Sequence, residues 1–183
     1  MFSRLIKLSL LLLVSHISLA QPMDTIPNQA DEYTLGASDV IEIVVFGEND
    51  LSVERRVNSC GNLSFPLLGE VSVQGKTLNE VAVLLSDMLK GDYLINPQLN
   101  VSMVEYRQFY VRGEVKSPGG FPYLPGLSID KAVAIGGGFT ERANRKKVEI
   151  SRELKDGSRE RMTVYMHDPV APGDIIIVKE SFF

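Results

Sequence analysis

The chain has 183 residues, of which 44% are hydrophobic and 23% are charged. This length suits one larger domain or two small ones, and the hydrophobic content is sufficient for a packed core. An excess of acidic over basic side chains, 23 against 19, argues against nucleic acid as a partner, and a single cysteine excludes an intramolecular disulfide.

The first twenty residues have the pattern of a secretory signal. Arg4 and Lys7 precede an apolar run from Leu8 to Val14, and small residues up to Ala20 predict cleavage between Ala20 and Gln21. Cleavage leaves 17 basic against 23 acidic side chains, which makes the exported chain more acidic still. Lipid attachment needs a cysteine at the junction, where Gln21 stands, and no later stretch has the roughly 20 apolar residues of a membrane helix.

A tail and a group of short strands are expected next. Residues 21–32 mix Pro, Asn, Gln and Asp without periodicity, which is typical of a flexible tail. The β-branched run at 39–46 predicts a strand buried largely on both faces. Further short strands are expected at 53–57, 63–66 and 67–71.

The best helix signal of the chain follows these strands. Thr77 and Glu80 have the spacing of a capping box, and an apolar stripe over 78–89 predicts an amphipathic helix. Asn96-Pro97 ends this pattern, and alternating apolar residues over 99–103 predict a half-exposed strand.

A second unit then repeats the order of strand, turn and helix. An apolar alternation leads to Pro118-Gly119, where proline presets φ and the glycine accepts the positive φ of a type II turn. Ser128 is placed to cap a helix over 129–135, which the glycines at 136–138 end.

A hairpin and a last strand complete the second unit. Alternating apolar residues on both sides of Asp156-Gly157 predict two antiparallel strands joined by a tight turn. A turn at 170–174 then leads into the β-branched run 175–178, which predicts a central strand.

These motifs resemble the polysaccharide biosynthesis/export proteins of the Wza type. Gly113-Glu-Val, Pro118-Gly119, a short helix and Gly-Gly-Phe-Thr are similar to the family's soluble-ligand-binding β-grasp (SLBB) module. Tyr-Thr-Leu-Gly36 with Asp39-Val40 is similar to the opening of the export domain, with Ala-Ser in place of the family's Pro-Gly. The turn residues that the resemblance marks are Gly36, Asp39, Gly61, Pro66, Gly69, Gly113, Pro118, Gly119, Gly137, Gly138, Gly173 and Asp174.

The resemblance implies an α+β protein with two domains after the signal peptide. A small mixed-sheet export domain is expected at 33–105, an SLBB-type β-grasp domain at 106–178 and a short tail at 179–183. The family further implies a periplasmic, non-enzymatic component of capsule or exopolysaccharide secretion without a cofactor. Such proteins form homo-oligomeric rings that pass the polysaccharide and work with an inner-membrane copolymerase and tyrosine kinase.

The C-terminal residues carry one further expectation. Five residues follow the last predicted strand and would rise about 7.5 Å as a helix, against a hydrocarbon core of about 30 Å. We therefore expect a periplasmic protein that associates with the outer membrane through partners, among them a separate outer-membrane β-barrel. Phe182-Phe183 is either a docking contact for such a partner or part of the β-grasp core.

Two functions from other classes remain open at this stage. A monomeric periplasmic module could bind a sugar or another small ligand through its β-grasp domain, and a hydrolase or lyase could hide paired carboxylates among the acidic residues. No motif supports catalysis: His167-Asp168 lacks further metal ligands, and the thiol of Cys60 lacks an evident base. The glycines at 136–138 follow a helix, whereas a phosphate-binding loop precedes one.

Three features allow two interpretations each. The densest basic cluster is either a solvated loop or a contact for an anionic polymer or an acidic partner, and it consists of Arg142, Arg145, Lys146 and Lys147. The aromatic residues around the Pro-Gly turn either pack in the core or stack on sugars, and they are Phe109, Tyr110, Phe121 and Tyr123. Cys60 is either a small turn or core residue or an intermolecular bridge.

Overall fold

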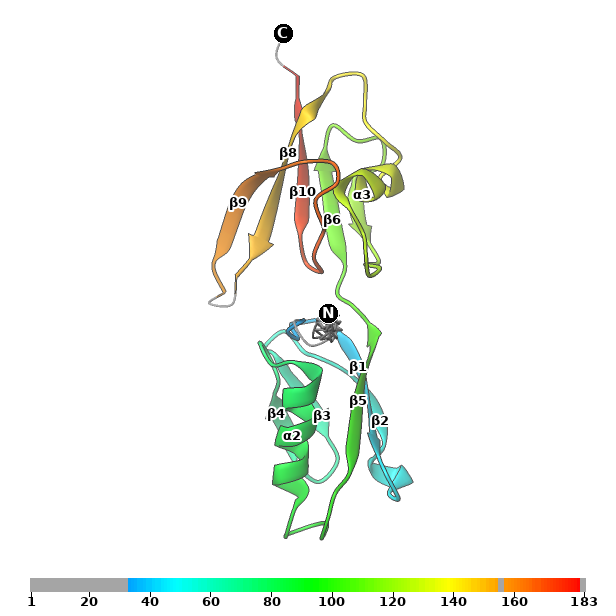
Figure 1. Ribbon diagram of the computed structural model, residues 1–183, viewed down its shortest axis with the longest axis vertical. Coiled ribbons are helices and arrows are strands. Elements are labelled where there is room, and N and C mark those ends of the chain that lie inside the picture. The colour runs from blue at the N-terminus through cyan, green and yellow to red at the C-terminus, as the bar shows by residue number, and fades with distance from the viewer. Residues whose placement is uncertain (1–32, 155–156, 182–183) are drawn as a thin grey trace, which may run out of the picture.

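The computed structural model describes residues 33–154 and 157–181 (Figure 1). The signal with its cleavage site at Ala20-Gln21, the N-terminal tail, Asp156 and Phe182-Phe183 lie outside the described residues. The elements in chain order are β1 (Val40–Val45), η1 (Asn49–Leu51), β2 (Val53–Arg56), β3 (Asn62–Phe65), β4 (Gly69–Ser72), α2 (Leu78–Leu89), β5 (Leu99–Glu105), β6 (Phe109–Gly113), β7 (Gly119–Phe121), α3 (Ile129–Ile135), β8 (Ala143–Glu153), β9 (Arg159–Val164) and β10 (Ile175–Glu180).

These elements form two units that follow one another along the long axis of the molecule (Figure 1). One hydrophobic core belongs to β1–β5 with α2, and a separate core belongs to β6–β10 with α3. We refer to the two units as the first and the second domain. The mixed α+β composition predicted from the sequence is confirmed.

In the first domain β1 lies between β2 and β5 in an antiparallel sheet, and β3 and β4 form a separate hairpin. Ile41, Ile43 and Val45 of β1 are buried, but Glu42 between them is exposed. The expectation of a strand buried largely on both faces therefore holds only in part, since Val40 on the face of Glu42 is buried and Val44 is half-buried. An antiparallel sheet can leave one face in water, and a run of β-branched residues does not by itself distinguish the two cases.

Helix α2 covers the inner face of this domain. Its N-terminus has the predicted capping box: the Thr77 hydroxyl accepts from the Glu80 N–H at 3.2 Å, and the Glu80 carboxylate accepts from the Thr77 N–H at 2.7 Å. Val81, Leu85 and Leu89 are the buried side chains of the helix. Caps of this kind contribute about 1 kcal/mol to helix stability.

The second domain is a five-stranded sheet in the order β7-β6-β10-β8-β9, and α3 packs on one face (Figure 1). Strand β10 lies in the centre of the sheet, the position that its continuous apolar run predicted. It runs parallel to β6 and antiparallel to β8. Strands β8 and β9 form the predicted hairpin, with Val148 opposite Val164 and Ile150 opposite Met162.

The predicted turn at Pro118-Gly119 differs from the structure. Gly119 begins β7 and does not have a positive φ, so the prediction of a type II turn with a left-handed glycine there was wrong. The glycine that the fold requires is Gly113 at the end of β6. Its φ is +90°, and a Cβ there would collide with the carbonyl oxygen of Val178 in the paired strand β10.

The N-terminus of α3 also differs from the sequence-based prediction, in one contact. Ser128 is the N-cap residue, as predicted, but its hydroxyl bonds to the Asp130 carboxylate and caps no backbone N–H. The first two N–H groups of the helix, those of Ile129 and Asp130, instead donate to the carbonyls of Asp168 and Met166 at 3.0 and 2.9 Å. The connection between β9 and β10 thus satisfies these groups, and no local sequence pattern indicates it.

Candidate functional site

In the described part of the chain, a densely hydrogen-bonded polar group surrounds Asp39, where the first domain meets the second. The Asp39 side chain is fully buried and accepts four hydrogen bonds. Two come from its own domain, from the Tyr33 hydroxyl at 2.6 Å and the Gly36 N–H at 2.8 Å. The other two come from Arg107, from its backbone N–H at 2.7 Å and its Nη1 at 3.0 Å. A buried carboxylate is tolerated only with such complete pairing.

Tyr33 completes the surroundings of this carboxylate. Burial, and then the negative charge of Asp39, raise the pKa of the Tyr33 phenol far above its ordinary value. The phenol therefore stays protonated and donates to Asp39, while its oxygen accepts from Arg107 Nη1 at 2.9 Å. The guanidinium also lies over the Tyr33 ring, 5.4 Å from the ring centroid, in a cation–π contact.

Arg107 lies between turns of both domains. A Cβ at Gly36 of the first domain would collide with its guanidinium, and a Cβ at Gly173 of the second domain would lie 2.9 Å from its Nε. A side chain at either turn would therefore displace the end of the Arg107 side chain from its present position, and the φ of +84° at Gly173 favours glycine there independently. The Arg107 side chain is 26% exposed, so it occupies the junction without being sealed from water.

A second buried aspartate has the same kind of surroundings within the second domain. Asp174 is 1% exposed, and its carboxylate accepts from Arg152 Nε at 2.9 Å and Nη2 at 2.7 Å. It also accepts from the N–H of Ala171, three residues earlier, at 2.8 Å. The hydrogen bond to Asp174 raises the pKa of the Arg152 guanidinium, which stays charged.

The two aspartate turns are built alike. Each aspartate accepts from the N–H three residues before it and is preceded by a residue with positive φ, Ser38 at +78° and Gly173 at +84°. Each leads directly into a strand that lies inside its sheet, β1 or β10. Both aspartates belong to the turn residues that the family resemblance marks.

Three tyrosine rings connect the domains beside these turns. Tyr106, in the segment between β5 and β6, packs edge-on against Tyr33 of the first domain, with centroids 5.1 Å apart and planes at 76°. It makes the same kind of contact with Tyr123 of the second domain, at 5.3 Å and 71°. Such pairs contribute about 0.5–1.5 kcal/mol each beyond their buried area.

A cleft of about 340 Å³ opens at this junction, and Arg56, Glu105, Arg107, Gln108, Tyr110 and Arg159 are among the residues that line it. Its guanidinium groups each pair with one carboxylate, in the pairs Arg56–Glu105 (2.9 Å), Arg107–Asp39 (3.0 Å) and Arg159–Glu153 (3.6 Å). The cleft is therefore rich in donors and acceptors but nearly neutral. Its size lies at the lower end of ligand sites, and its chemistry suits hydroxyl groups and an apolar ring face.

The predicted turn residues do not form one site. Gly36, Asp39, Gly173 and Asp174 meet at the junction. Gly61, Pro66 and Gly69 lie in the turns around β3 and β4 of the first domain. A third group lies in the segments that connect β6, β7 and α3 with their neighbours, and it consists of Gly113, Pro118, Gly119, Gly137 and Gly138.

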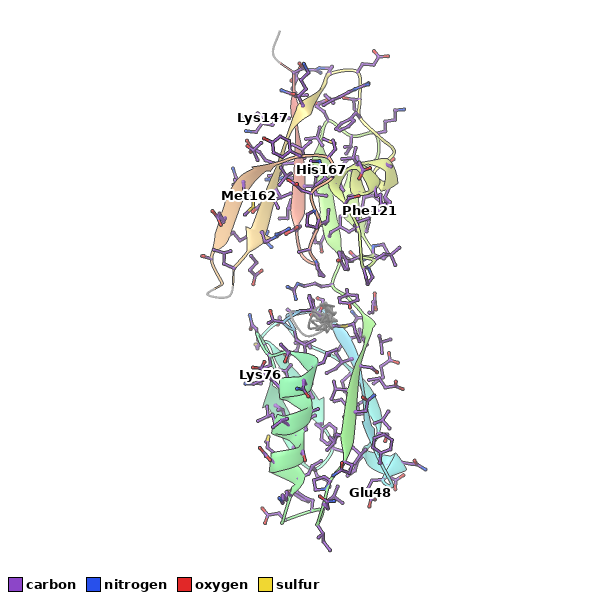
Figure 2. The ribbon with its side chains drawn as sticks, viewed as in Figure 1. Glu48, Lys76, Phe121, Lys147, Met162 and His167 are labelled. Atoms are coloured by element: carbon purple, nitrogen blue, oxygen red, sulfur yellow. The ribbon has the colours of Figure 1, made fainter. Side chains whose placement is uncertain are left out.

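The basic cluster is not the loop that one interpretation expected. Arg145, Lys146 and Lys147 belong to β8, in an irregular part where the pairing with β10 shifts register. Their side chains are exposed, and Figure 2 shows Lys147 on the second domain away from the junction. Arg142 precedes the strand and forms an ion pair with Glu180. Only the last three residues of the cluster thus form a continuous basic segment.

The other candidate residues are simpler. His167 is 86% exposed and lies 3.7 Å from the Asp168 carboxylate, and Cys60 is exposed. Phe109 is fully buried in the second core, as the packing interpretation expected, whereas Tyr110 is 47% exposed and faces the junction cleft. Within the described ranges, no group of three or more His, Cys, Asp or Glu residues could hold a metal ion, and no helix is long and apolar enough to cross a membrane.

Sequence reasoning missed Tyr33, Tyr106 and Arg107 as parts of one site. Arg107 is 68 residues from Asp39 in the chain, so no local spacing connects the two. The aromatic-basic pair Tyr106-Arg107 at the expected domain boundary was the available signal. A boundary segment that carries a large ring and a guanidinium is unusual for a flexible linker.

Comparison with protein families identifies both domains. Residues 27–104 match the family model described as polysaccharide biosynthesis/export protein, and residues 108–164 match the SLBB domain. The SLBB match ends before β10, the central strand of the second sheet.

Individual relatives agree with the family models. The chain is 33% identical to the exopolysaccharide production protein ExoF of Rhizobium meliloti (strain 1021) over 131 residues, 65% of this chain and 31% of ExoF. It is 25% identical to the EPS I polysaccharide export outer membrane protein EpsA of Ralstonia nicotianae (strain ATCC BAA-1114 / GMI1000), over 81% of this chain and 46% of EpsA. It is 26% identical to the polysialic acid transport protein KpsD of Escherichia coli, over 80% of this chain and 28% of KpsD.

The chain spans less than half the length of these curated relatives. Their names describe production, export and transport of polysaccharides, and none describes an enzyme. The two family models together match most of the chain, in the order predicted from its motifs. The chain therefore belongs to the Wza-type family of polysaccharide biosynthesis/export proteins, with one export domain followed by one SLBB domain.

Proposed function

We propose that this protein is a periplasmic component of a capsular polysaccharide or exopolysaccharide export machine, and that it forms a ring-shaped conduit for the polymer. The observation that carries the proposal is the junction, at which Arg107 joins the export domain to the SLBB domain through the buried Asp39. A closed ring requires every subunit to present the same two lateral surfaces at the same angle. A junction with complete hydrogen bonding keeps that angle constant from subunit to subunit.

The partners belong to the same proposal. The family resemblance supports an inner-membrane copolymerase and tyrosine kinase as partners. The exposed segment Arg145–Lys147 is a candidate contact for an anionic polymer or for an acidic partner surface.

A second function is favoured by the cleft at the junction. Its nearly neutral lining of paired charges, Gln108 and Tyr110 suits a sugar unit, so a monomeric periplasmic ligand-binding module remains the alternative. The two functions differ in one measurable property, because a conduit requires self-association and a binding module does not.

Crosslinking in the periplasm followed by sizing separates the two functions. Cells that produce the full-length protein with its partners are treated with a short amine-reactive crosslinker, and the products are sized by denaturing electrophoresis. We expect a ladder of multiples of the chain that ends at one highest species, and we expect deletion of the gene to abolish polymer at the cell surface. A monomer under these conditions, together with normal export in the deletion strain, would contradict the proposal.

A further inference from the structure

Four large apolar side chains are exposed at the end of the first domain that points away from the second. Their exposed fractions are 64% for Phe46, 56% for Leu67, 48% for Tyr93 and 95% for Ile95. They come from three connections, between β1 and η1, β3 and β4, and α2 and β5. The connections at this end lie opposite the junction (Figure 1), and Figure 2 marks the place with Glu48. We call these four residues the apolar tip.

The apolar tip is one surface. Phe46, Tyr93 and Ile95 line a common cleft of about 350 Å³, together with Glu48 and the segment between Tyr93 and Pro97. Leu67, in the connection between β3 and β4, is joined to this group because the Tyr93 hydroxyl donates a hydrogen bond to the Leu67 carbonyl at 3.4 Å. Exposed apolar residues scattered singly need no explanation, but a group with its own cleft indicates a contact surface.

The backbone at Leu67 supports this interpretation independently. Leu67 has a φ of +67°, a left-handed conformation that glycine or asparagine adopts far more easily than leucine. The residue lies in the short turn between β3 and β4, where a glycine would satisfy the fold better. More than half of the leucine residue is exposed to water. A strained residue that exposes an apolar group points to a function outside the fold.

Charge selects the kind of partner. Glu48, Asp50 and Asp92 are exposed beside the apolar tip, and Lys90 is the basic residue in the same connections. In the described part of the chain, none of these three carboxylates forms an ion pair. An acidic rim is repelled by an anionic bilayer surface and attracts a basic one.

A second copy of this chain fits less well. The densest exposed basic segment of the chain is Arg145–Lys147, and residues 142–147 include no exposed large apolar side chain. That segment could pair with the acidic rim but would leave the four apolar side chains of the tip uncovered. Stable interfaces need a desolvated apolar centre within the polar rim.

We propose that the apolar tip docks onto another protein whose contact surface combines apolar side chains with lysine or arginine residues. Phe46, Tyr93 and Ile95 form the centre of the contact, Leu67 adds to its edge, and the three carboxylates meet the basic residues of the partner. This surface lies outside the junction and does not depend on the proposed conduit.

Site-specific photocrosslinking in cells tests this proposal. The photoreactive amino acid p-benzoylphenylalanine replaces Phe46 in the full-length protein, and the matched control places it at Tyr165, an aromatic residue of the second domain that is 69% exposed. We expect one discrete adduct with another protein from position 46 and none from position 165. The joined peptide of the partner should carry apolar residues together with Lys or Arg.

Two further variants connect the adduct with the structural argument. Leu67→Gly should keep or raise thermal stability and should weaken docking about tenfold, since it removes both the strain and an apolar contact. Asp92→Lys should lower the yield of the adduct, whereas Glu160→Lys, an exposed acid on β9, should not. A merely structural role of Leu67 would lower stability and adduct yield together.

Four results would overturn the proposal. They are an adduct with a second copy of this chain, an adduct with lipid, a partner peptide without basic residues, and an adduct yield from position 46 no higher than from position 165.

Discussion

The two buried aspartates show how differently the same turn can be used in the two domains. In the second domain, the arginine that neutralises Asp174 comes from β8 of the same sheet. In the first domain, the arginine that neutralises Asp39 comes from the segment that leads into the second domain. The second domain is therefore complete in itself. The first domain depends on the junction to satisfy its buried charge, so its stability and the orientation of the domains are coupled.

Removal of the two arginines should produce the largest effects and separate the domains. Arg107→Ala leaves Asp39 buried without its cation and should destabilise the first domain by about 3 kcal/mol or more. Arg152→Ala should cost about as much but act on the second domain alone. Thermal unfolding followed by calorimetry checks this, because each variant should lower a different transition. Arg56→Ala is the control, since its pair with Glu105 is more than half exposed and contributes under about 1 kcal/mol.

Gly113→Ala should cause the next largest loss of stability, and this loss should be confined to the second domain. Its positive φ and the contact with the carbonyl of Val178 predict a loss of about 1–3 kcal/mol. Gly119→Ala is the matched control, because an added Cβ there would lie 3.9 Å from a Phe121 ring carbon, which is an ordinary van der Waals contact. Urea unfolding of both variants decides between the two glycines. Equal losses at both positions would show that Gly113 is not the sensitive turn.

Alkaline pH should weaken the first domain through Tyr33. Burial and Asp39 raise the folded pKa of this phenol above its unfolded value of 10.0. A raised folded pKa means that the contribution is fully present below pH 10 and is lost as the pH rises above it, because only the unfolded chain then releases the proton. Denaturant unfolding at pH 9 and pH 11 should show this loss. In Tyr33→Phe, the slope of the unfolding free energy against pH should be smaller. An unchanged slope in Tyr33→Phe would assign the loss to other groups.

The smallest expected effect comes from a substitution that makes the turn before Asp39 resemble the turn before Asp174. Ser38 adopts a φ of +78° at the position where the second turn has Gly173. Ser38→Gly removes the left-handed penalty of about 1–2 kcal/mol, less about 0.5–1 kcal/mol for the greater freedom of glycine in the unfolded chain. A stability gain of about 0.5–1 kcal/mol should follow in urea unfolding. The backbone carbonyl of Ser38, which accepts from Arg56, remains available in the variant. A loss of stability would mean that the serine hydroxyl has a role in the turn.

Local patterns predicted the elements whose stabilising groups are close in sequence. The capping box of α2 lies within four residues, and the hairpin of β8 and β9 and the continuous apolar run of β10 were equally visible. Errors occurred where the deciding partner is distant. The positive φ lies at Gly113 because β10 passes beside it, and α3 is capped by carbonyls from the β9–β10 connection.

The candidate site could be predicted only in its parts. Family motifs marked Asp39 and Asp174 as turn residues, but their burial and their arginine partners depend on how the strands are placed in space. The basic cluster was visible as a charge run, whereas its division between an ion pair at Arg142 and an exposed strand segment depends on the register of β8 against β10. Sequence spacing carries no information on contacts of that range.

The distribution of distances between the two domains tests the central claim that the Asp39–Arg107 contact fixes their orientation. Spin labels on cysteines at Val83 and Tyr165, both exposed and one in each domain, report this distance by pulsed electron resonance in a Cys60→Ser background. We expect one narrow distribution for the otherwise unchanged protein and for Arg56→Ala, and a clearly broader one for Arg107→Ala. A distribution that is equally broad in all three proteins would contradict the claim.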